Sequence, residues 1–222
     1  MSRPARAFIF DMDGTIVDNM AWHTKSWLEF FARRGRLYEA DAFFRETAGA
    51  QGREILRARL GPEVTDAEIA ALALEKDALY REMYGPHRRT IEGLDQLVAQ
   101  ARSRGVQLAV ATSAPPLNIA FTLDELELRA RFDTVVGATD VARGKPHPDV
   151  FLKAAERLGV DPADCIVFED APLGVEAARR AGMRAVVITT TLPAAAFAEY
   201  DNVVRVVNDY ADLSVDALCA SM

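Results

Sequence analysis

The chain has 222 residues, half of them hydrophobic, with a formal net charge of −7 and an isoelectric point near 5.1. A chain of this length buries a full hydrophobic core and has room for a second, smaller domain. The acidic balance argues against a general nucleic-acid-binding protein, because contacts with the phosphate backbone require a basic surface.

Cellular location is predicted from what the sequence lacks. Its apolar runs fall short of the roughly 18 residues that span a bilayer, and we find no signal-peptide core ahead of the first predicted strand. The two cysteines, Cys165 and Cys219, are too few for a disulfide framework, and Cys165 is predicted to be a buried structural thiol. We therefore expect a cytoplasmic protein with no membrane and no nucleic-acid partner. Whether it is a monomer or a dimer stays open.

The first predicted strand, residues 7–10, leads directly into Asp11-Met12-Asp13-Gly14-Thr15. Two carboxylates this close disfavour each other's ionisation unless a cation or a reaction uses them. Gly14 permits a sharp turn after the second carboxylate, and Thr15 adds a hydroxyl group. This segment therefore predicts phosphate and metal chemistry.

From about residue 19 to residue 84 the pattern is helical throughout. Apolar periodicity predicts helices at residues 22–34, 41–47, 52–60 and 65–84. Gly61-Pro62 separates two of these helices, and Gly85-Pro86 ends the segment. We predict a helical cap domain of residues 19–85, inserted into a core of residues 1–18 and 86–222.

The remainder of the chain alternates between helices and short apolar strands. Further strands are predicted at residues 106–111, 134–136, 165–168, 185–188 and 203–207. Continuous apolar strands that alternate with helices predict an α/β fold with a doubly wound parallel sheet.

Polar residues follow three of these strands. They are Thr112-Ser113, then Gly144-Lys145-Pro146 beyond a loop, then Glu169-Asp170. Each has an ordinary structural explanation when taken alone, as a turn, a solvated loop residue or a helix cap. Ligands of open parallel sheets bind outside the carboxyl ends of the strands, so these groups are expected to converge with Asp11 and Asp13.

The order of these motifs resembles that of the haloacid dehalogenase superfamily, over essentially the whole chain. The motifs are DMDGT at residues 11–15, ATS at 111–113, GKPHPD at 144–149 and FEDAPLGVEAARRAGM at 168–183. The helical insertion after the first motif is similar to the cap of the subfamily that contains β-phosphoglucomutase and many small-molecule phosphatases.

This resemblance implies roles for the residues of the motifs. Asp11 would be the nucleophile that forms an aspartyl-phosphate, and Asp13 would be the general acid and base. Lys145 would neutralise charge during catalysis and bind phosphate, together with Thr112 and Ser113. A carboxylate attacks phosphorus only when such negative charge is neutralised.

The resemblance also implies Mg²⁺ as the cofactor. Asp11, Asp170 and the Asp13 carbonyl group would hold the ion, with Glu169 acting directly or through a water molecule. Mg²⁺ prefers oxygen ligands and keeps several waters, which suits this set.

Substrate choice is expected to come from the cap, through His23 and Arg53. β-Phosphoglucomutase-like proteins carry a His at the position of His23, facing the active site. Residues 47–54 resemble the loop that reads the substrate in the same proteins. Ala48 stands where the mutase has a Lys, and Gly52 stands at the mutase Arg, which weakens the mutase alternative.

We therefore expect a Mg²⁺-dependent phosphatase acting on a small phosphorylated metabolite, of sugar or polyol phosphate type. A phosphosugar mutase of the β-phosphoglucomutase type is the alternative. A 2-haloacid dehalogenase ranks lower because that reaction needs neither the metal nor Asp13, and a noncatalytic binding module ranks last because every motif residue is present.

Overall fold

The computed structural model describes residues 5–47 and 50–220. The chain divides into a core unit, Met1–Asp18 with Arg89–Met222, and a helical unit, Asn19–Arg88. The second junction falls between Arg88 and Arg89, whereas the sequence predicted it between residues 85 and 86. A 3₁₀-helix at Gly85–His87 follows the last helix of the helical unit and belongs to that unit.

The core unit is built on a parallel sheet. Its strands, within the described residues, are β1 (Ala7–Phe10), β2 (Gln107–Ala111), β3 (Thr134–Val136), β4 (Cys165–Glu169), β5 (Arg184–Ile188) and β6 (Val203–Val207). They lie in the order β3-β2-β1-β4-β5-β6, and every neighbouring pair is parallel. The predicted fold class is confirmed. The order reverses at β1 and β4, which is where sheets of this kind bind ligands.

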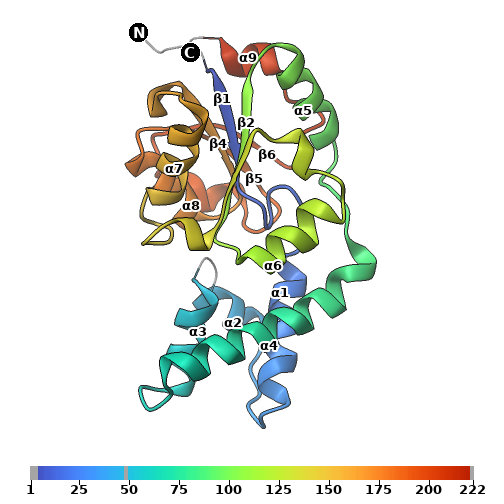
Figure 1. Cartoon of the computed structure of the whole chain (residues 1–222), viewed down its shortest axis with the longest axis vertical. Coiled ribbons are helices and arrows are strands. Elements are labelled where there is room, and N and C mark those ends of the chain that lie inside the picture. Colours follow the sequence, from blue (N-terminus) through green and yellow to red (C-terminus); the bar gives the residue numbers. More distant parts are fainter. Residues whose placement is uncertain (1–4, 48–49, 221–222) are drawn as a thin grey trace. The chain divides into compact units, whose positions relative to one another are not determined.

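The two faces of the sheet are covered by different helices (Figure 1). Alternate side chains of a strand point to opposite faces, so Phe8 and Phe10 join one hydrophobic cluster while Ala7 and Ile9 join another. Helices α5 (Leu94–Ser103), α6 (Pro116–Ile119) and α9 (Val215–Cys219) contribute to the first cluster. Helices α7 (Asp149–Leu158) and α8 (Pro172–Arg180) contribute to the second. The core unit is therefore a three-layer sandwich.

Most strand ends match the prediction, and one difference bears on the site. Glu169, predicted to follow the fourth strand, is the last residue of β4 and pairs with Val187 of β5. Phe168 before it stacks on Phe10, with the ring centroids 4.4 Å apart. Burial of one such side chain stabilises the fold by about 1.5–3 kcal/mol, so these strand ends are fixed by packing as well as by hydrogen bonds. Cys165 begins the same strand as a fully buried free thiol, as predicted, and burial raises its pKa to about 12.

The helical unit contains α1 (Met20–Ala32), α2 (Ala40–Thr47), α3 (Gly52–Leu60) and α4 (Asp66–Tyr84), close to the predicted ranges. Its own core comprises Trp27, Phe30, Phe31, Phe43, Ile55, Leu56, Ile69 and Leu79. Helix α4 begins at a capping box, in which Thr65 and Glu68 bond to each other's backbone N–H groups. In the described part of the chain, helices fall short of the length and apolar character needed to cross a membrane.

Candidate active site

The carboxyl ends of β1 and β4 bring two predicted carboxylates to one ammonium group. Lys145 Nζ donates to Asp11 Oδ1 at 2.5 Å and to Glu169 Oε1 at 2.6 Å. All three side chains are more than nine-tenths buried. The Asp11 N–H donates to the Phe168 carbonyl oxygen at 2.9 Å, so the ladder between the two strands continues to this point. The predicted convergence of these groups is therefore present in the core unit.

Burial and crowding of charge shift the pKa values of this group. Burial, with the charges of Glu169 and Asp13, raises the pKa of Asp11 to about 8 although Lys145 opposes the shift. Burial, Glu169 and Asp11 likewise raise the pKa of Asp170 well above its usual value. Burial alone would lower the pKa of Lys145, but the charges of Asp11 and Glu169 outweigh it and raise that pKa. A buried cluster with more carboxylates than cations favours a further cation.

Glu169 is the most firmly held member of the cluster. Its Oε2 accepts from the N–H groups of Asp170 and Ala171, each at 3.0 Å, while Oε1 accepts from Lys145. Gly174, in the first turn of α8, leaves room for this carboxylate, because a Cβ there would lie 1.7 Å from Oε1. Both oxygens are engaged, so Glu169 is better suited to hold Lys145 than to bind a metal directly.

Asp170 is oriented by hydroxyl groups. Thr191 donates from Oγ1 to Asp170 Oδ2, and Thr15 donates to Oδ1 at a long 3.4 Å. Gly14 has φ 78°, and a Cβ on it would lie 2.0 Å from Asp170 Oδ2, so only glycine fits both the turn and the space. Tyr210 donates from Oη to the Thr15 carbonyl oxygen at 2.8 Å, which anchors the same turn.

The donor set fits Mg²⁺ in its chemistry. Among the residues that the structure describes, no three Asp, Glu, His or Cys side chains form a ready-made ligand group. Mg²⁺ does not require one, because it usually takes one or two carboxylates and keeps several waters. Asp11 and Asp170 supply hard oxygen ligands at a point of excess negative charge, and Asp13, two residues beyond Asp11, is partly exposed.

The predicted phosphate-binding residues follow β2. Thr112 is buried, accepts from the Ala114 N–H at 3.1 Å and donates its own N–H to the Val136 carbonyl oxygen. Because Phe10 pairs with Val110, the same register places Ala111 level with Asp11 and Thr112 one residue further along, at the same edge of the sheet. Ser113 is exposed. Thr112 is thus fixed by the backbone around it, whereas the Ser113 side chain is not packed into the fold.

The predicted substrate residues belong to the helical unit. The His23 ring stacks on Tyr80 with centroids 3.8 Å apart, and its Nδ1 lies 3.5 Å from Lys76 Nζ. Lys76 is only 4% exposed and pairs with Asp77 at 2.9 Å. Arg53 is exposed on α3. Ala48, one of the positions on which the mutase alternative turned, lies outside the described residues.

Sequence reasoning missed Thr190, Thr191, Tyr210 and Lys76. Thr190 and Thr191 follow β5, at the edge of the sheet where the other motif residues lie, and this position is a signal in the sequence. Tyr210 lies three residues beyond β6, as Thr191 lies three residues beyond β5, so its place after a strand is a signal of the same kind. Lys76 gave no such signal, because it lies within helix α4.

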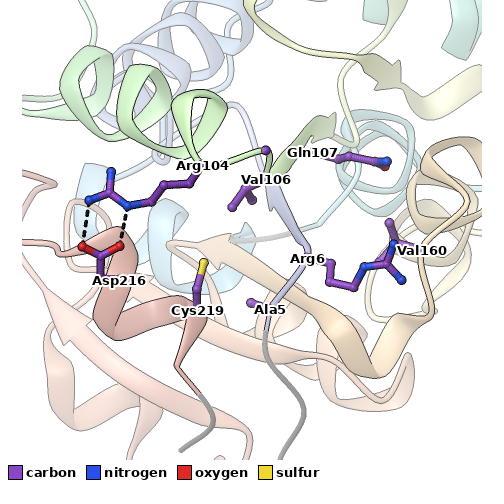
Figure 2. A pocket seen from close by; sticks show the side chains of 9 residues that line it. Ala5, Arg6, Arg104, Val106, Gln107, Val160, Asp216 and Cys219 are labelled. Carbon is purple, nitrogen blue, oxygen red and sulfur yellow. Dashed lines mark hydrogen bonds and ion pairs between the residues drawn. The ribbon is translucent and has the colours of Figure 1, made fainter.

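A cavity of about 390 Å³ lies elsewhere in the core unit (Figure 2). Residues at the amino ends of β1 and β2 line it, and Arg104 and Asp216 face each other across an ion pair at one side. None of the predicted site residues is among its described lining residues. It is therefore separate from the acidic cluster at the opposite edge of the sheet.

Comparisons with known proteins point to one family. A family model described as haloacid dehalogenase-like hydrolase matches residues 5–182. A validoxylamine A 7'-phosphate phosphatase from Streptomyces hygroscopicus subsp. limoneus is 35% identical over 199 residues, covering 87% of this chain and 90% of that protein. The fructose-1-phosphate phosphatase YqaB of Escherichia coli is 38% identical over 178 residues, with coverages of 80% and 93%. A β-phosphoglucomutase from Bacillus subtilis is 32% identical over 188 residues and covers 82% of each chain.

A solved structure extends this similarity to three dimensions. A HAD hydrolase of family IA, variant 3, from Entamoeba histolytica superposes with a TM-score of 0.89 at 25% identity, covering 96% of this chain and 97% of that one. The similarity therefore includes both the sheet and the helical insertion.

Proposed function

Because this chain belongs to the haloacid dehalogenase-like hydrolases, we propose that it is a Mg²⁺-dependent phosphatase of a small phosphomonoester, of sugar or polyol phosphate type. The family confirms the resemblance seen in the motifs. The observation that carries the proposal is the buried ammonium of Lys145 between the carboxylates of Asp11 and Glu169. The phosphatases among its relatives act on phosphorylated small molecules, as their names state, which supports the substrate class.

Asp11 is the nucleophile in this proposal. Its carboxylate attacks phosphorus, forming a phosphorus–oxygen bond while the bond to the substrate's alcohol oxygen breaks. Asp13 gives a proton to the departing alkoxide. Lys145 lies against Asp11 and offsets negative charge as the nucleophile and the phosphoryl group approach each other.

Asp13 acts again in the second half of the reaction. It takes a proton from a water molecule, which attacks phosphorus and breaks the bond to Asp11, releasing inorganic phosphate. One residue thus serves first as acid and then as base. Thr112 would donate a hydrogen bond to a phosphoryl oxygen throughout, with Ser113 assisting.

Asp11, Asp170 and the Asp13 carbonyl group would hold the Mg²⁺, with Glu169 acting through Lys145 or through water. When bound, the ion supplies charge neutralisation for the phosphoryl oxygens. We assign Glu169 chiefly to orienting Lys145, since both of its oxygens already accept hydrogen bonds.

The helical unit is proposed to choose the substrate, through His23 and Arg53. The Lys76 ammonium beside His23 Nδ1 can only donate, so this contact requires Nδ1 to accept and leaves the ring proton on Nε2. Arg53 is exposed and free to reach a charged group.

A mutase of the β-phosphoglucomutase type stays the alternative, supported by the relative of that name. Hydrolysis is preferred because a mutase must bind a second phosphate while its bisphosphorylated intermediate reorients. The Arg of the mutase loop corresponds to Gly52 here, and Arg53 follows one residue later. Isomer formation from glucose 1-phosphate, primed with glucose 1,6-bisphosphate, would identify a mutase.

The test is a screen for release of inorganic phosphate from sugar, polyol, nucleotide and amino-acid phosphates, with Mg²⁺ or with EDTA. The expected result is Mg²⁺-dependent release from a sugar or polyol phosphate by the wild type and none by Asp11→Asn. Absence of release from every compound, by folded protein with Mg²⁺, would overturn the proposal.

A further inference from the structure

Three consecutive threonines, Thr189 to Thr191, follow β5 at the carboxyl edge of the sheet, and their hydroxyl groups have different partners. Thr189 bonds to the Val207 carbonyl oxygen at 3.3 Å and to Asn208 Oδ1 at 2.8 Å. Thr190 and Thr191 instead bond to the segments that follow β1 and β4. Thr190 donates to the Gly14 carbonyl oxygen, and Thr191 donates to Asp170 Oδ2.

The space around the Asp170 carboxylate is tightly filled. A Cβ on Gly14 would lie 2.0 Å from Asp170 Oδ2 and 2.8 Å from Thr191 Oγ1. The Gly14 backbone, the Asp170 carboxylate and the Thr191 hydroxyl group are therefore packed against one another. Asp170 itself is 3% exposed. A side-chain rotation that broke the bond to Thr191 would leave a buried carboxylate oxygen without that donor, which is costly.

The Thr15 hydroxyl group is a weaker donor to this carboxylate. Thr15 Oγ1 lies 3.4 Å from Asp170 Oδ1, beyond the usual range for a hydroxyl bond. Thr191 is therefore the closer hydroxyl partner. Thr190, the residue before Thr191, donates to the turn at Gly14. The segment after β5 is therefore hydrogen-bonded both to the loop that follows β1 and to Asp170, which follows β4.

We propose that Thr191 is a positioning residue, whose hydroxyl group fixes the Asp170 carboxylate in the orientation that binds Mg²⁺. The inference rests on the proposed function for the identity of the ion. Groups that hydrogen-bond to metal ligands set the ligands' orientation, and their loss typically lowers metal affinity by about 10–100-fold.

The threonine series provides matched variants. Thr191→Val keeps the shape and removes the donor, Thr191→Ser keeps the donor, and Thr189→Val makes the same change at the residue that faces β6. Mg²⁺ affinity of the full-length protein, measured by titration calorimetry without substrate, is expected to fall by about tenfold or more in Thr191→Val. Affinity in Thr191→Ser and Thr189→Val is expected to stay near the wild-type value.

Phosphatase kinetics provide a second readout. In Thr191→Val, the Mg²⁺ concentration for half-maximal rate is expected to rise while most of the rate returns at saturating Mg²⁺. If Thr191→Val does not fold, Thr191→Ala serves in its place, with far-UV circular dichroism as the check.

Wild-type Mg²⁺ affinity in Thr191→Val, an equal loss in Thr189→Val, or a wild type that binds no Mg²⁺ would overturn the inference. The two proposals fail separately. If Mg²⁺ binds and the threonine series behaves as stated but no phosphate is released, only the proposed function fails. If phosphate is released but Thr191→Val binds Mg²⁺ normally, only the role of Thr191 fails.

Discussion

Gly174 and Glu169 are so close that a single added methyl group would overlap the carboxylate, at 1.7 Å from Oε1. The absent side chain on α8 is what lets Glu169 turn back over its own backbone and meet Lys145. A glycine in a helix is ordinarily unfavourable, by about 1 kcal/mol relative to Ala. At Gly174, the missing side chain leaves the space that the carboxylate of Glu169, the partner of Lys145, occupies.

Gly174→Ala should therefore lower activity although it raises helix propensity. The added methyl group would displace the Glu169 carboxylate, and Lys145 would move with it because the two are hydrogen-bonded. Misplacement of a group in the reaction by about 1 Å lowers the rate roughly 10²-fold. Steady-state phosphate release measures the effect. Arg180→Gln, on the same helix at an exposed ion pair with Glu176, is the control and should keep wild-type activity. A fully active Gly174→Ala would show that Glu169 does not set the position of Lys145.

Asp11→Asn is expected to abolish turnover, by on the order of 10³-fold or more, because the amide cannot form the phosphoryl-enzyme bond. Mg²⁺ should still bind measurably, since Asp170 and the Asp13 carbonyl group are unchanged. Calorimetry and phosphate release on the same preparation separate the two effects. Normal turnover in this variant would rule out Asp11 as the nucleophile.

Asp13→Ala should lose most of the activity through loss of proton transfer, by about 10²–10⁴-fold. A substrate with a good leaving group, such as p-nitrophenyl phosphate, needs less help from an acid in the first step. In Asp13→Ala, the rate at which the phosphoryl-enzyme forms from that substrate should therefore fall less than the rate at which the phosphoryl-enzyme is hydrolysed. Rapid-quench kinetics measure both rates. Retention of the full rate on an alkyl phosphate would remove the acid–base role.

Lys145→Ala should destabilise the core unit as well as inactivate it. Removal of the ammonium leaves two buried carboxylates facing each other, and breaking a buried ion pair from one side typically costs about 3–5 kcal/mol. Urea denaturation in EDTA measures the loss. Lys153→Ala removes an exposed Lys that pairs with Glu156 and should change stability by less than about 1 kcal/mol. Equal stability of Lys145→Ala and wild type would contradict the structure's buried pair.

Glu176 should make stability depend on pH in the acid range. Hydrogen bonds from Arg179 and Arg180 lower the pKa of Glu176 from 4.5 to about 2. A carboxylate with a depressed pKa stabilises the fold above its unfolded-state value, and this contribution is lost as pH falls from about 4.5 through about 2. The wild type should exceed Glu176→Gln in free energy of unfolding at pH 6, and the difference should shrink toward pH 2. A difference that stays constant across that range would exclude the ion pairs as its source.

Much of the fold was predictable because β1, β2 and β4 are continuous apolar runs that can only be buried on both faces. Asp11, Lys145 and Glu169 were predictable as a group because parallel strands deliver their carboxyl ends to one edge. The sequence predicted that the strand ends before Glu169, whereas Glu169 is its last residue. An acidic residue does not fit the apolar pattern of a buried strand, and its partner Lys145 could not be known from the strand itself.

The residues that were missed depend on distant packing. Thr15 and Tyr210 are 195 positions apart in sequence, and no local periodicity links them. Lys76 lies among charged residues in α4, where a lysine is normally solvated, and its burial against His23 follows from how α1 meets α4. Thr191 and Tyr210 differ from Lys76, because each lies three residues beyond the end of a strand, where residues of a binding site are expected.

The position of Glu169 inside β4 has a dynamic consequence. The backbone on either side of it is hydrogen-bonded into the sheet, through Asp11 to β1 and through Val187 to β5. Amide groups in such a centre exchange with solvent only when the whole sheet opens, so the backbones of Asp11 and Glu169 keep their spacing during the faster local fluctuations that loops undergo. The two carboxylates that hold the Lys145 ammonium are therefore preorganised before any ligand arrives.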